Sequence, residues 1–260
     1  MNQTEVHNPV LAQIHQHASV RRYKPDPVPR DWVEAIVAAG QRAATSSNLQ
    51  AYSVVAVTDA AVRREAAHWC GDQAHIAEAP VFLVWCADLS RLERVCELRG
   101  MQQVTDYVEN FLVAVVDTAL AMQNAALAAE SLGLGTCYIG GIRNHPREII
   151  RLLGLPRLTF PIAGMTLGFP AVRPEPRPRL PLRAVLHWER YDRAHEDEAL
   201  REYDRVMAAT GIYDRRQIPV PGKPEQLEDY GWLEHTARRI SQPTRTRLRD
   251  VLREQGFALL

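Results

Sequence analysis

Two arginines, Arg177 and Arg179, stand one residue apart in the proline-rich stretch EPRPRLP. Proline fixes its own φ angle and disfavours helical geometry in the residue before it. Residues i and i+2 of an extended segment point to the same side. We therefore expect this stretch to stay extended and to present two positive charges side by side to a common partner.

Four other loops bring polar side chains or glycines to places where a ligand could bind. In chain order they are HASVRRY with His17, Ser19, Arg21 and Arg22, TSSNLQ from Thr45 to Gln50, GDQAH with Gln73, and YIGGIRN with Gly140 and Gly141. Taken singly, the first is typical of a solvated loop, the second of helix capping and the last of a tight turn. Their meaning depends on whether the fold brings them together.

The usual motifs of nucleotide binding and of hydrolysis are missing from the chain. The glycines of GLGTCYIGG do not have GxGxxG spacing, and they follow a helix where a dinucleotide fold requires a strand. No GxxxxGK(S/T), HExxH or GxSxG sequence occurs. The nine histidines show no metal-ligand spacing beyond the weak pair His15 and His17. We therefore expect no metal site and no hydrolytic triad.

Composition places the chain among ordinary globular proteins. Hydrophobic residues make up 46% and charged residues 24% of its 260 positions, and the formal net charge is zero, which argues against nucleic acid as a partner. The four cysteines form no CxxC pair, as expected for thiols in a reducing cytosol. The N-terminus lacks the pattern of a signal peptide, and the apolar run 111–116 is too short to span a bilayer. We expect a cytoplasmic protein without a membrane partner.

The elements that must position these loops alternate between helix and strand. Hydrophobic periodicity and capping residues predict helices over 10–16, 31–42, 59–70 and 145–153, and strands over 52–57, 80–87, 136–139 and 160–167. The apolar run 80–87 is typical of a strand covered on both faces. Long helices fill some of the gaps between strands, so we predict an α+β fold with a central mixed sheet flanked by helices.

A long helix is predicted over residues 105–132. Asn110, Asp117, Asn124 and Ser131 recur every seven residues and predict one narrow polar stripe. Nearly all other positions are apolar, which predicts a helix buried nearly all round. At 1.5 Å per residue it would be roughly 40 Å long. We interpret part of its surface as a subunit interface. The alternative is a central helix lying wholly inside one domain.

The C-terminal third differs in composition. Arginine and proline become frequent after Pro170, and the sequence beyond Glu189 is charged and weakly periodic, with a turn-rich break at IPVPGKP. We predict a core over residues 1–186 and a C-terminal helical excursion of the same domain over residues 187–260.

Taken in order, the motifs resemble those of FMN-dependent nitroreductases. HASVR, TSSNLQ, GDQAH, the long string from Val115 to Asn144 and RPRLP occur in the family's sequence, and the likeness covers nearly the whole chain. It is strongest for the group of NADPH-dependent flavin reductases and oxygen-insensitive major nitroreductases. The resemblance implies a nitroreductase-like fold, a homodimer with the long helix at its interface, bound FMN, and NADPH as co-substrate, with NADH possible.

The resemblance also assigns residues to the cofactor. It implies that Arg177 and Arg179 bind the FMN phosphate together with the HASVR loop, that Arg21 lies near the flavin N1–O2 edge, and that the main chain of the paired glycines reaches the N5–O4 edge. Thr45 and Ser47 would contact the ribityl chain or the ring, from the partner subunit in one arrangement. The complete expected set is His17, Ala18, Ser19, Val20, Arg21, Thr45, Ser47, Gln73, Tyr138, Ile139, Gly140, Gly141, Arg177 and Arg179.

Some positions depart from the family pattern. Ala18 stands where relatives usually carry arginine, which removes one expected phosphate contact, and Asn48 stands where they often carry an aromatic residue near the open face of the flavin. Arg215 and Arg216 are candidates for the NADPH 2′-phosphate in an altered C-terminal segment. Arg245 matches a family arginine that faces the substrate.

The expected activity is ping-pong hydride transfer from NADPH through FMN to nitroaromatics, quinones or free flavins. The flavin carries the chemistry, so no catalytic side chain is expected. Two alternatives stay open at this point. One is a dedicated biosynthetic flavin oxidase or reductase acting on one metabolite, and the other is a non-catalytic flavin-binding regulatory dimer.

Overall fold

A computed structural model of the chain describes residues 8–220 and 222–260, which form two compact units. One unit contains the chain up to Pro176 together with Arg245–Leu260, and the other contains Arg177–Thr244. The predicted boundary at residue 186 lies ten residues beyond the first of these divisions.

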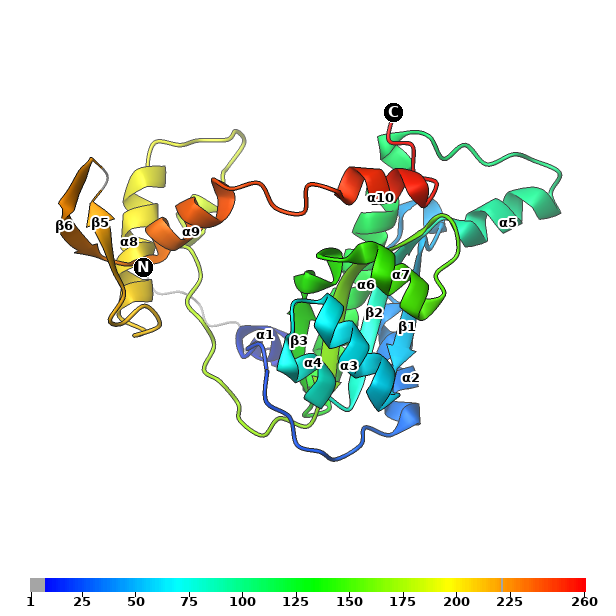
Figure 1. Ribbon diagram of the computed structural model, residues 1–260, viewed down its shortest axis with the longest axis horizontal. Helices are drawn as coiled ribbons and strands as arrows, with labels where there is room; N and C mark the ends of the chain where they lie inside the picture. Colours follow the sequence, from blue (N-terminus) through cyan, green and yellow to red (C-terminus); the bar gives the residue numbers. More distant parts are fainter. Residues whose placement is uncertain (1–7, 221) are drawn as a thin grey trace. The chain divides into compact units, whose positions relative to one another are not determined.

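The first unit is a four-stranded sheet with helices on both faces (Figure 1). Its strands are β1 (Tyr52–Val57), β2 (Val81–Asp88), β3 (Gly135–Ile139) and β4 (Thr159–Gly168). Its helices are α1 (Pro9–His15), α2 (Arg30–Gly40), α3 (Ala60–Trp69), α4 (Ala74–Glu78), α5 (Ser90–Leu98), α6 (Val108–Ser131), α7 (Pro146–Leu153) and α10 (Leu248–Glu254). The predicted strands and helices of this part are therefore confirmed to within a few residues.

Local signals account for this agreement. Asp59 caps α3, because its carboxylate accepts hydrogen bonds from the backbone N–H groups of Ala61 and Val62 at 2.8 and 2.9 Å. Every residue of β2 is buried, as predicted for a strand covered on both faces.

The prediction of a mixed sheet is wrong for the described chain. The strand order is β1-β2-β4-β3, and all three pairings between neighbours are antiparallel. The prediction rested on strands and helices that are interleaved, with very long helices in some of the gaps between strands. A connection of any length can also return the chain to an antiparallel neighbour, so connection length alone does not determine strand direction.

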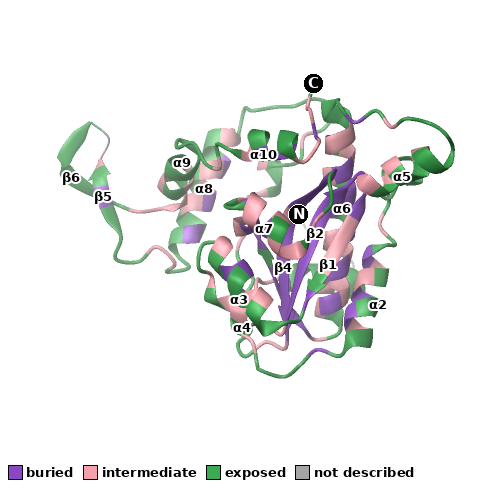
Figure 2. Ribbon diagram, turned by 45° about the vertical axis from the view of Figure 1, so that its right-hand side comes forward, coloured by how far each residue is buried: buried purple, intermediate pink, exposed green. Residues whose placement is uncertain are grey.

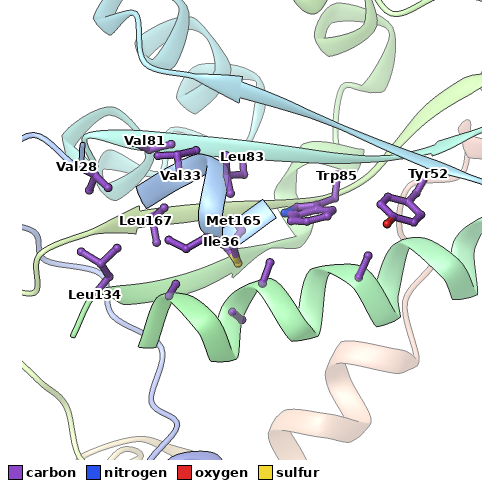
Figure 3. Close-up of a cluster of buried hydrophobic side chains, with 14 residues drawn as sticks. Val28, Val33, Ile36, Tyr52, Val81, Leu83, Trp85, Leu134, Met165 and Leu167 are labelled. Atoms are coloured by element: carbon purple, nitrogen blue, oxygen red, sulfur yellow. The ribbon is translucent and has the colours of Figure 1, made fainter. Parts of the chain in front are cut away.

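The two faces of the sheet pack against different helices. Leu83 and Trp85 of β2 point towards α2 and α6, where they join a cluster that includes Ile36 (Figure 3). Phe82 and Val84, on the opposite face, pack with residues of α3, α4 and α7. The layers are thus helix, sheet and helix, and the strands form the buried centre of Figure 2.

Helix α6 is less completely buried than its sequence predicts. Seven of its residues are buried, but Leu112, Val116 and Leu120 are 52, 47 and 44% exposed. These three positions are four residues apart and form one apolar stripe on the helix. By length and apolar composition α6 could cross a membrane, a property that core helices share, and its buried face packs on the sheet. We conclude that it is a core helix with one uncovered apolar side.

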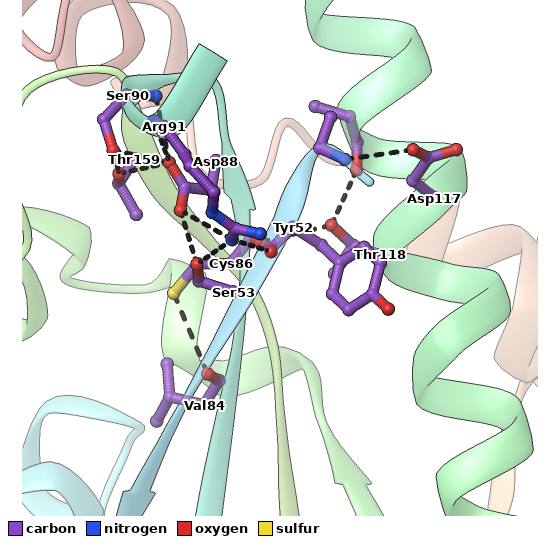
Figure 4. Close-up of polar contacts among 12 residues, drawn as sticks. Tyr52, Ser53, Val84, Cys86, Asp88, Ser90, Arg91, Asp117, Thr118 and Thr159 are labelled. Atoms are coloured by element: carbon purple, nitrogen blue, oxygen red, sulfur yellow. Dashed lines mark hydrogen bonds and ion pairs between the residues drawn. The ribbon is translucent and has the colours of Figure 1, made fainter. Parts of the chain in front are cut away.

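Asp117 lies on the buried side of α6 rather than on a polar stripe. Its two carboxylate oxygens accept hydrogen bonds from the backbone N–H groups of Ser46 and Ala51 at 2.9 and 3.1 Å. Figure 4 shows Asp117 on α6 beside the start of β1. Asp117 is only 1% exposed, so this carboxylate depends on those two donors. It holds the TSSNLQ loop and the start of β1 against the helix.

The second unit is not wholly helical, which corrects the expectation of a helical excursion. Its helices are α8 (Glu196–Ala208) and α9 (Trp232–Ile240), but a hairpin of β5 (Gln217–Val220) and β6 (Lys223–Asp229) separates them. The predicted turn-rich break, IPVPGKP, falls inside this hairpin except for Pro221, which lies outside the described residues. The two strands were not predicted because they contain Pro219 and Pro224, and proline argues against a strand unless the strand lies at an edge.

The stretch with the two arginines does not form a helix, as its prolines predict. Residues 173–181 contain neither helix nor strand. The Tyr203 hydroxyl of α8 donates a hydrogen bond to the Pro178 carbonyl at 3.0 Å, and the Tyr203 ring meets Trp232 edge to face at 4.8 Å. A buried tyrosine therefore fixes the backbone between Arg177 and Arg179, and both arginines remain exposed.

The anchoring role of Asp117 can be tested by substitution. We expect Asp117→Ala to lower the free energy of unfolding by about 2–4 kcal/mol, because two backbone donors lose their acceptor. Asn110→Ala is the matched control on the same helix. Its side chain donates one exposed hydrogen bond to the Val104 carbonyl, so its loss should be below about 1 kcal/mol. Equal losses in urea titrations of the two variants would contradict the anchoring role.

Candidate functional site

The HASVRRY loop lies along the free edge of the sheet, beside β3. The Val20 N–H donates to the Thr136 carbonyl at 2.8 Å, and the Tyr23 hydroxyl donates to the Val20 carbonyl at 2.7 Å. The side chain of Val20 fills the space beside Gly135, where a Cβ would approach it to 2.6 Å. The loop is thus held closely to the strand that leads into the paired glycines.

His17 is bound to helix α6. Its Nδ1 lies 2.7 Å from Oε1 of Glu130, and the same oxygen accepts a hydrogen bond from the Thr136 hydroxyl at 2.9 Å. The side chain of Glu130 is 9% exposed and that of His17 is 27% exposed. One carboxylate therefore joins the histidine loop to the first residues of β3.

Arg21 lies near α4 and β3. Burial chiefly raises the pKa of the Cys137 thiol, and the charge of Arg21 together with hydrogen bonds from Ser19 and Arg21 opposes the rise. Burial lowers the pKa of His75, and the Arg21 charge lowers it further. The buried Nε2 of His75 has no hydrogen-bond partner within the part of the chain that the structure describes. The positive charge of Arg21 and the unpaired ring nitrogen of His75 therefore lie in the same region.

Gln73 and Gly141 are in direct contact. The Gln73 amide donates to the Cys70 carbonyl at 2.7 Å. A Cβ on Gly141 would lie 2.4 Å from both the Cys70 carbonyl oxygen and the Gln73 amide nitrogen. Glycine is required at 141 by the packing of the protein itself, and the family resemblance gave no indication of this.

Gly140 has two guanidinium groups beside it, at ordinary contact distance. A Cβ there would lie 3.6 Å from Nη2 of Arg143 and 3.9 Å from Nη2 of Arg245. Arg245 donates to the Asn144 amide oxygen at 3.0 Å, and both arginines line a pocket of about 290 Å³. Burial lowers the pKa of Arg143, and the charge of Arg245 lowers it further. The site is therefore strongly positive next to the glycine backbone.

The two residues before the glycines, Tyr138 and Ile139, point to opposite faces of β3. Ile139 is buried in the core, so only its main chain is available to a ligand. Tyr138 is partly exposed, and its hydroxyl donates to Gln123 of α6 at 3.0 Å or to the Met122 carbonyl at 3.2 Å. Burial chiefly raises the pKa of Tyr138.

Thr45, Ser47 and Asn48 lie at a different place in the first unit. Their loop is held by Asp117, whereas the histidine loop is held by Glu130, and thirteen residues of α6 correspond to about 20 Å. Ser47 and Asn48 have φ angles of 47° and 57°, in the left-handed region that ordinary residues rarely adopt. One protomer therefore holds this strained loop apart from the histidine loop.

The remaining predicted residues belong to the second unit. The charge of Arg177 lowers the pKa of Tyr213, against a larger opposite effect of burial, and the Arg216 guanidinium lies 5.9 Å from the centre of the Tyr230 ring. Arg215 has a φ of 63° in the turn before β5. The approach of Arg177 and Arg179 to the histidine loop stays a prediction.

A pocket of about 230 Å³ opens beside Ala18, the position where the family usually has arginine. Its lining includes Val20, Glu130, Gly135 and Arg173. Arg173 donates to the Gly133 carbonyl at 2.7 Å. A nearby arginine from another segment therefore lines the space that the shorter side chain leaves.

Sequence reasoning missed Glu130, Asp117 and Arg143 as parts of the site. The long string from Val115 to Asn144 contains all three, and it is the most specific part of the family likeness. Carboxylates on a helix that is otherwise apolar are the signal that could have identified the first two, because buried acids require partners.

Two family models match the chain. The model described as "Nitroreductase family" matches residues 14–169, and the one described as "Nitroreductase family, C-terminal domain" matches residues 177–260. The second match begins where the second compact unit begins.

Individual relatives cover nearly the whole chain. It is 37% identical over 244 residues to the "CR(VI) reductase" of Pseudomonas sp., with 94% of this chain and 97% of the relative covered. It is 36% identical to the oxygen-insensitive NADPH nitroreductase of Salmonella typhimurium, with 96% of this chain and 99% of the relative covered. The fold is also similar to a solved structure, the NADPH:FMN oxidoreductase from Vibrio harveyi complexed with NAD+, with a TM-score of 0.84. The two chains are 33% identical, and the match covers 96% of this chain and 99% of the other.

The two glycines should respond differently to an added methyl group. We expect Gly141→Ala to lower the free energy of unfolding by about 1–3 kcal/mol, because its Cβ overlaps Gln73 and a backbone carbonyl. Gly140→Ala, the matched control, should cost less than about 1 kcal/mol, since the nearest atom is at ordinary contact distance. Thermal unfolding of the cofactor-free proteins measures both, and the reverse order would contradict the packing described here.

Proposed function

The chain belongs to the nitroreductase family, and we propose that it is an FMN-dependent NAD(P)H oxidoreductase. The observation that carries the proposal is the meeting of distant motifs along β3 and at the glycines that follow it. Gln73 contacts Gly141, the histidine loop pairs with Thr136, and Arg21 lies near His75. A family likeness in sequence alone would not require these contacts.

The chemistry of this region suits a flavin mononucleotide. His17, Ser19 and Arg21 come from one loop and offer cationic and hydroxyl donors, which a phosphate monoester prefers. Arg177 and Arg179 are proposed to complete the phosphate site from the second unit. The main chain at Gly140, where a Cβ would lie no closer than 3.6 Å to its nearest neighbour, is proposed to receive the flavin ring. When bound, FMN supplies the hydride-transfer chemistry.

The side chains then have positioning and electrostatic roles. Arg21 is proposed to place a fixed positive charge at the N1–O2 edge of the ring, and the paired glycines to donate main-chain hydrogen bonds at its other edge. Arg245, in the pocket beside Gly140, is proposed to face the second substrate. Arg215 and Arg216 are proposed to bind the 2′-phosphate of NADPH. Each of these roles binds or orients a group, and none moves a proton.

We propose NADPH as electron donor, with NADH as a possible donor, and nitroaromatics, quinones or free flavins as acceptors. The names of relatives support this choice. One is an oxygen-insensitive NADPH nitroreductase, and another is an NADPH:FMN oxidoreductase whose structure is a complex with NAD+. The four cysteines are all free thiols, which supports a reducing, cytoplasmic location.

We propose further that the active protein is a homodimer built on α6. The apolar stripe of Leu112, Val116 and Leu120 supports an interface there, since such a surface is unfavourable in water. The separation of the strained Ser47 loop from the histidine loop supports it independently. A two-fold axis near α6 would allow the loop of one protomer to reach the site of its partner.

The activity is tested by flavin reduction. We expect the purified protein to be yellow, to release FMN on denaturation, and to lose its visible absorbance when NADPH is added without oxygen. A quinone or nitroaromatic should restore the absorbance, because the acceptor takes the two electrons. Protein that binds FMN but is not bleached by either nucleotide would contradict the proposal and favour a regulatory flavin-binding protein. Bleaching without reoxidation by any generic acceptor would favour an enzyme dedicated to one metabolite.

The interface is tested on the apolar stripe. We expect Leu120→Glu to weaken self-association roughly a hundredfold or more, because a symmetric interface would bury two unpaired carboxylates. Leu120→Met keeps the apolar surface and should leave association unchanged. Sedimentation of both variants over a range of concentrations gives the result, and a dimer unaffected by the glutamate would place the interface elsewhere.

A further inference from the structure

We propose that Glu130 is a positioning residue that keeps His17 doubly protonated, so that Nε2–H of its ring can donate to the phosphate of FMN. This inference rests on the proposed function, because it assigns a role within the same phosphate site. Glu130 lies outside the expected set of cofactor residues, and the inference assigns it an indirect role in binding the phosphate.

The contact between the two side chains has the geometry of a charge-assisted hydrogen bond. His17 Nδ1 and Glu130 Oε1 are 2.7 Å apart, within the range for a cationic donor and a carboxylate. Glu130 has no proton to give to Nδ1 when it is ionised, so Nδ1 must be the donor. The protonation of one ring nitrogen is thereby determined.

The location of Glu130 is unfavourable for an acid unless a cation stands beside it. The residue lies in the last turn of α6, where the helix dipole repels negative charge. Its side chain is only 9% exposed, so solvent screens the charge poorly. The Thr136 hydroxyl supplies one hydrogen bond but no charge. An imidazolium at His17 supplies the compensating charge.

The second ring nitrogen is the one available to a ligand. No hydrogen bond to Nε2 of His17 occurs among the residues that the structure describes, and the side chain is 27% exposed. A neutral ring with its proton on Nδ1 would present the Nε2 lone pair to the phosphate, which repels it. Only the doubly protonated ring can use both nitrogens as donors, one to Glu130 and one to the phosphate.

Other charged and titratable groups face this pair from several elements. Arg173 lines the same pocket as Glu130, and Glu130 adds slightly to the rise in the pKa of Tyr138 that burial causes. Arg21 and Arg22 follow in the histidine loop, and Cys137 lies on β3. The positive charges of the arginines disfavour another positive charge on the ring of His17. The carboxylate of Glu130 is the group that favours the charged ring.

The test replaces the carboxylate by an isosteric amide and measures FMN binding. Glu130→Gln retains an oxygen that can accept from Nδ1, but it has no charge to stabilise the imidazolium. We expect its dissociation constant for FMN, measured by flavin fluorescence quenching, to rise roughly tenfold at pH 8. The rise should be smaller at pH 6, because an ordinary histidine is largely protonated there. An unchanged dissociation constant at both values of pH would overturn the inference.

A second measurement reports on His17 without any cofactor. Nitrogen-15 NMR of the FMN-free protein at pH 7.5 should show both ring nitrogens of His17 protonated in the wild type and one of them unprotonated in Glu130→Gln. A purely structural tether between the loop and α6 would not produce this difference. Identical nitrogen shifts in the two proteins would exclude the proposed protonation.

Two further variants separate the possible outcomes. Glu109→Gln makes the same charge change in the exposed first turn of α6 and should alter neither measurement. Arg179→Ala should weaken FMN binding but leave the nitrogen shifts of His17 unchanged. If the wild type bound no FMN, the proposed function would fail, whereas the NMR comparison would still decide whether Glu130 maintains the protonation of His17.

Discussion

The candidate site depends on two carboxylates of one helix. Asp117 holds the TSSNLQ loop at the start of β1, and Glu130 holds the histidine loop at the start of β3. Helix α6 can impose this spacing because its buried face packs on the sheet, so neither carboxylate can move without disturbing the core. The distance between the two loops is therefore a property of the core and not of the loops.

The sequence predicted the parts of the fold whose signals are local. The bounds of β1, the Asp59 cap and the full burial of β2 each follow from a few neighbouring residues. Strand direction was not predictable in this way, because it depends on where long helical connections return. The β5–β6 hairpin was missed because Pro219 and Pro224 weaken the strand pattern of residues that are mostly exposed.

For the site, the sequence motifs identified the loops that form it but not the residues that hold those loops in place. The partners of His17 and Gly141 lie 113 and 68 residues away in sequence, at Glu130 and Gln73. Nothing in the periodicity of α6 distinguishes a carboxylate that faces a loop from one that faces solvent. The heptad spacing of Asp117 suggested a polar stripe, whereas tertiary contacts give this residue a buried anchoring role.

The proposed dimer would account for the strain in the TSSNLQ loop. Ser47, Asn48 and Gln50 all have positive φ angles, and this costs of order 1 kcal/mol or more for each. Asp117 compensates part of that cost by binding the ends of the loop, but the side chains in its middle remain exposed. The apolar stripe on the uncovered side of α6 is likewise exposed in the part of the chain that the structure describes. A second protomer on α6 would cover the stripe and give the strained loop something to contact, so the dimer and the cofactor site would form in one step.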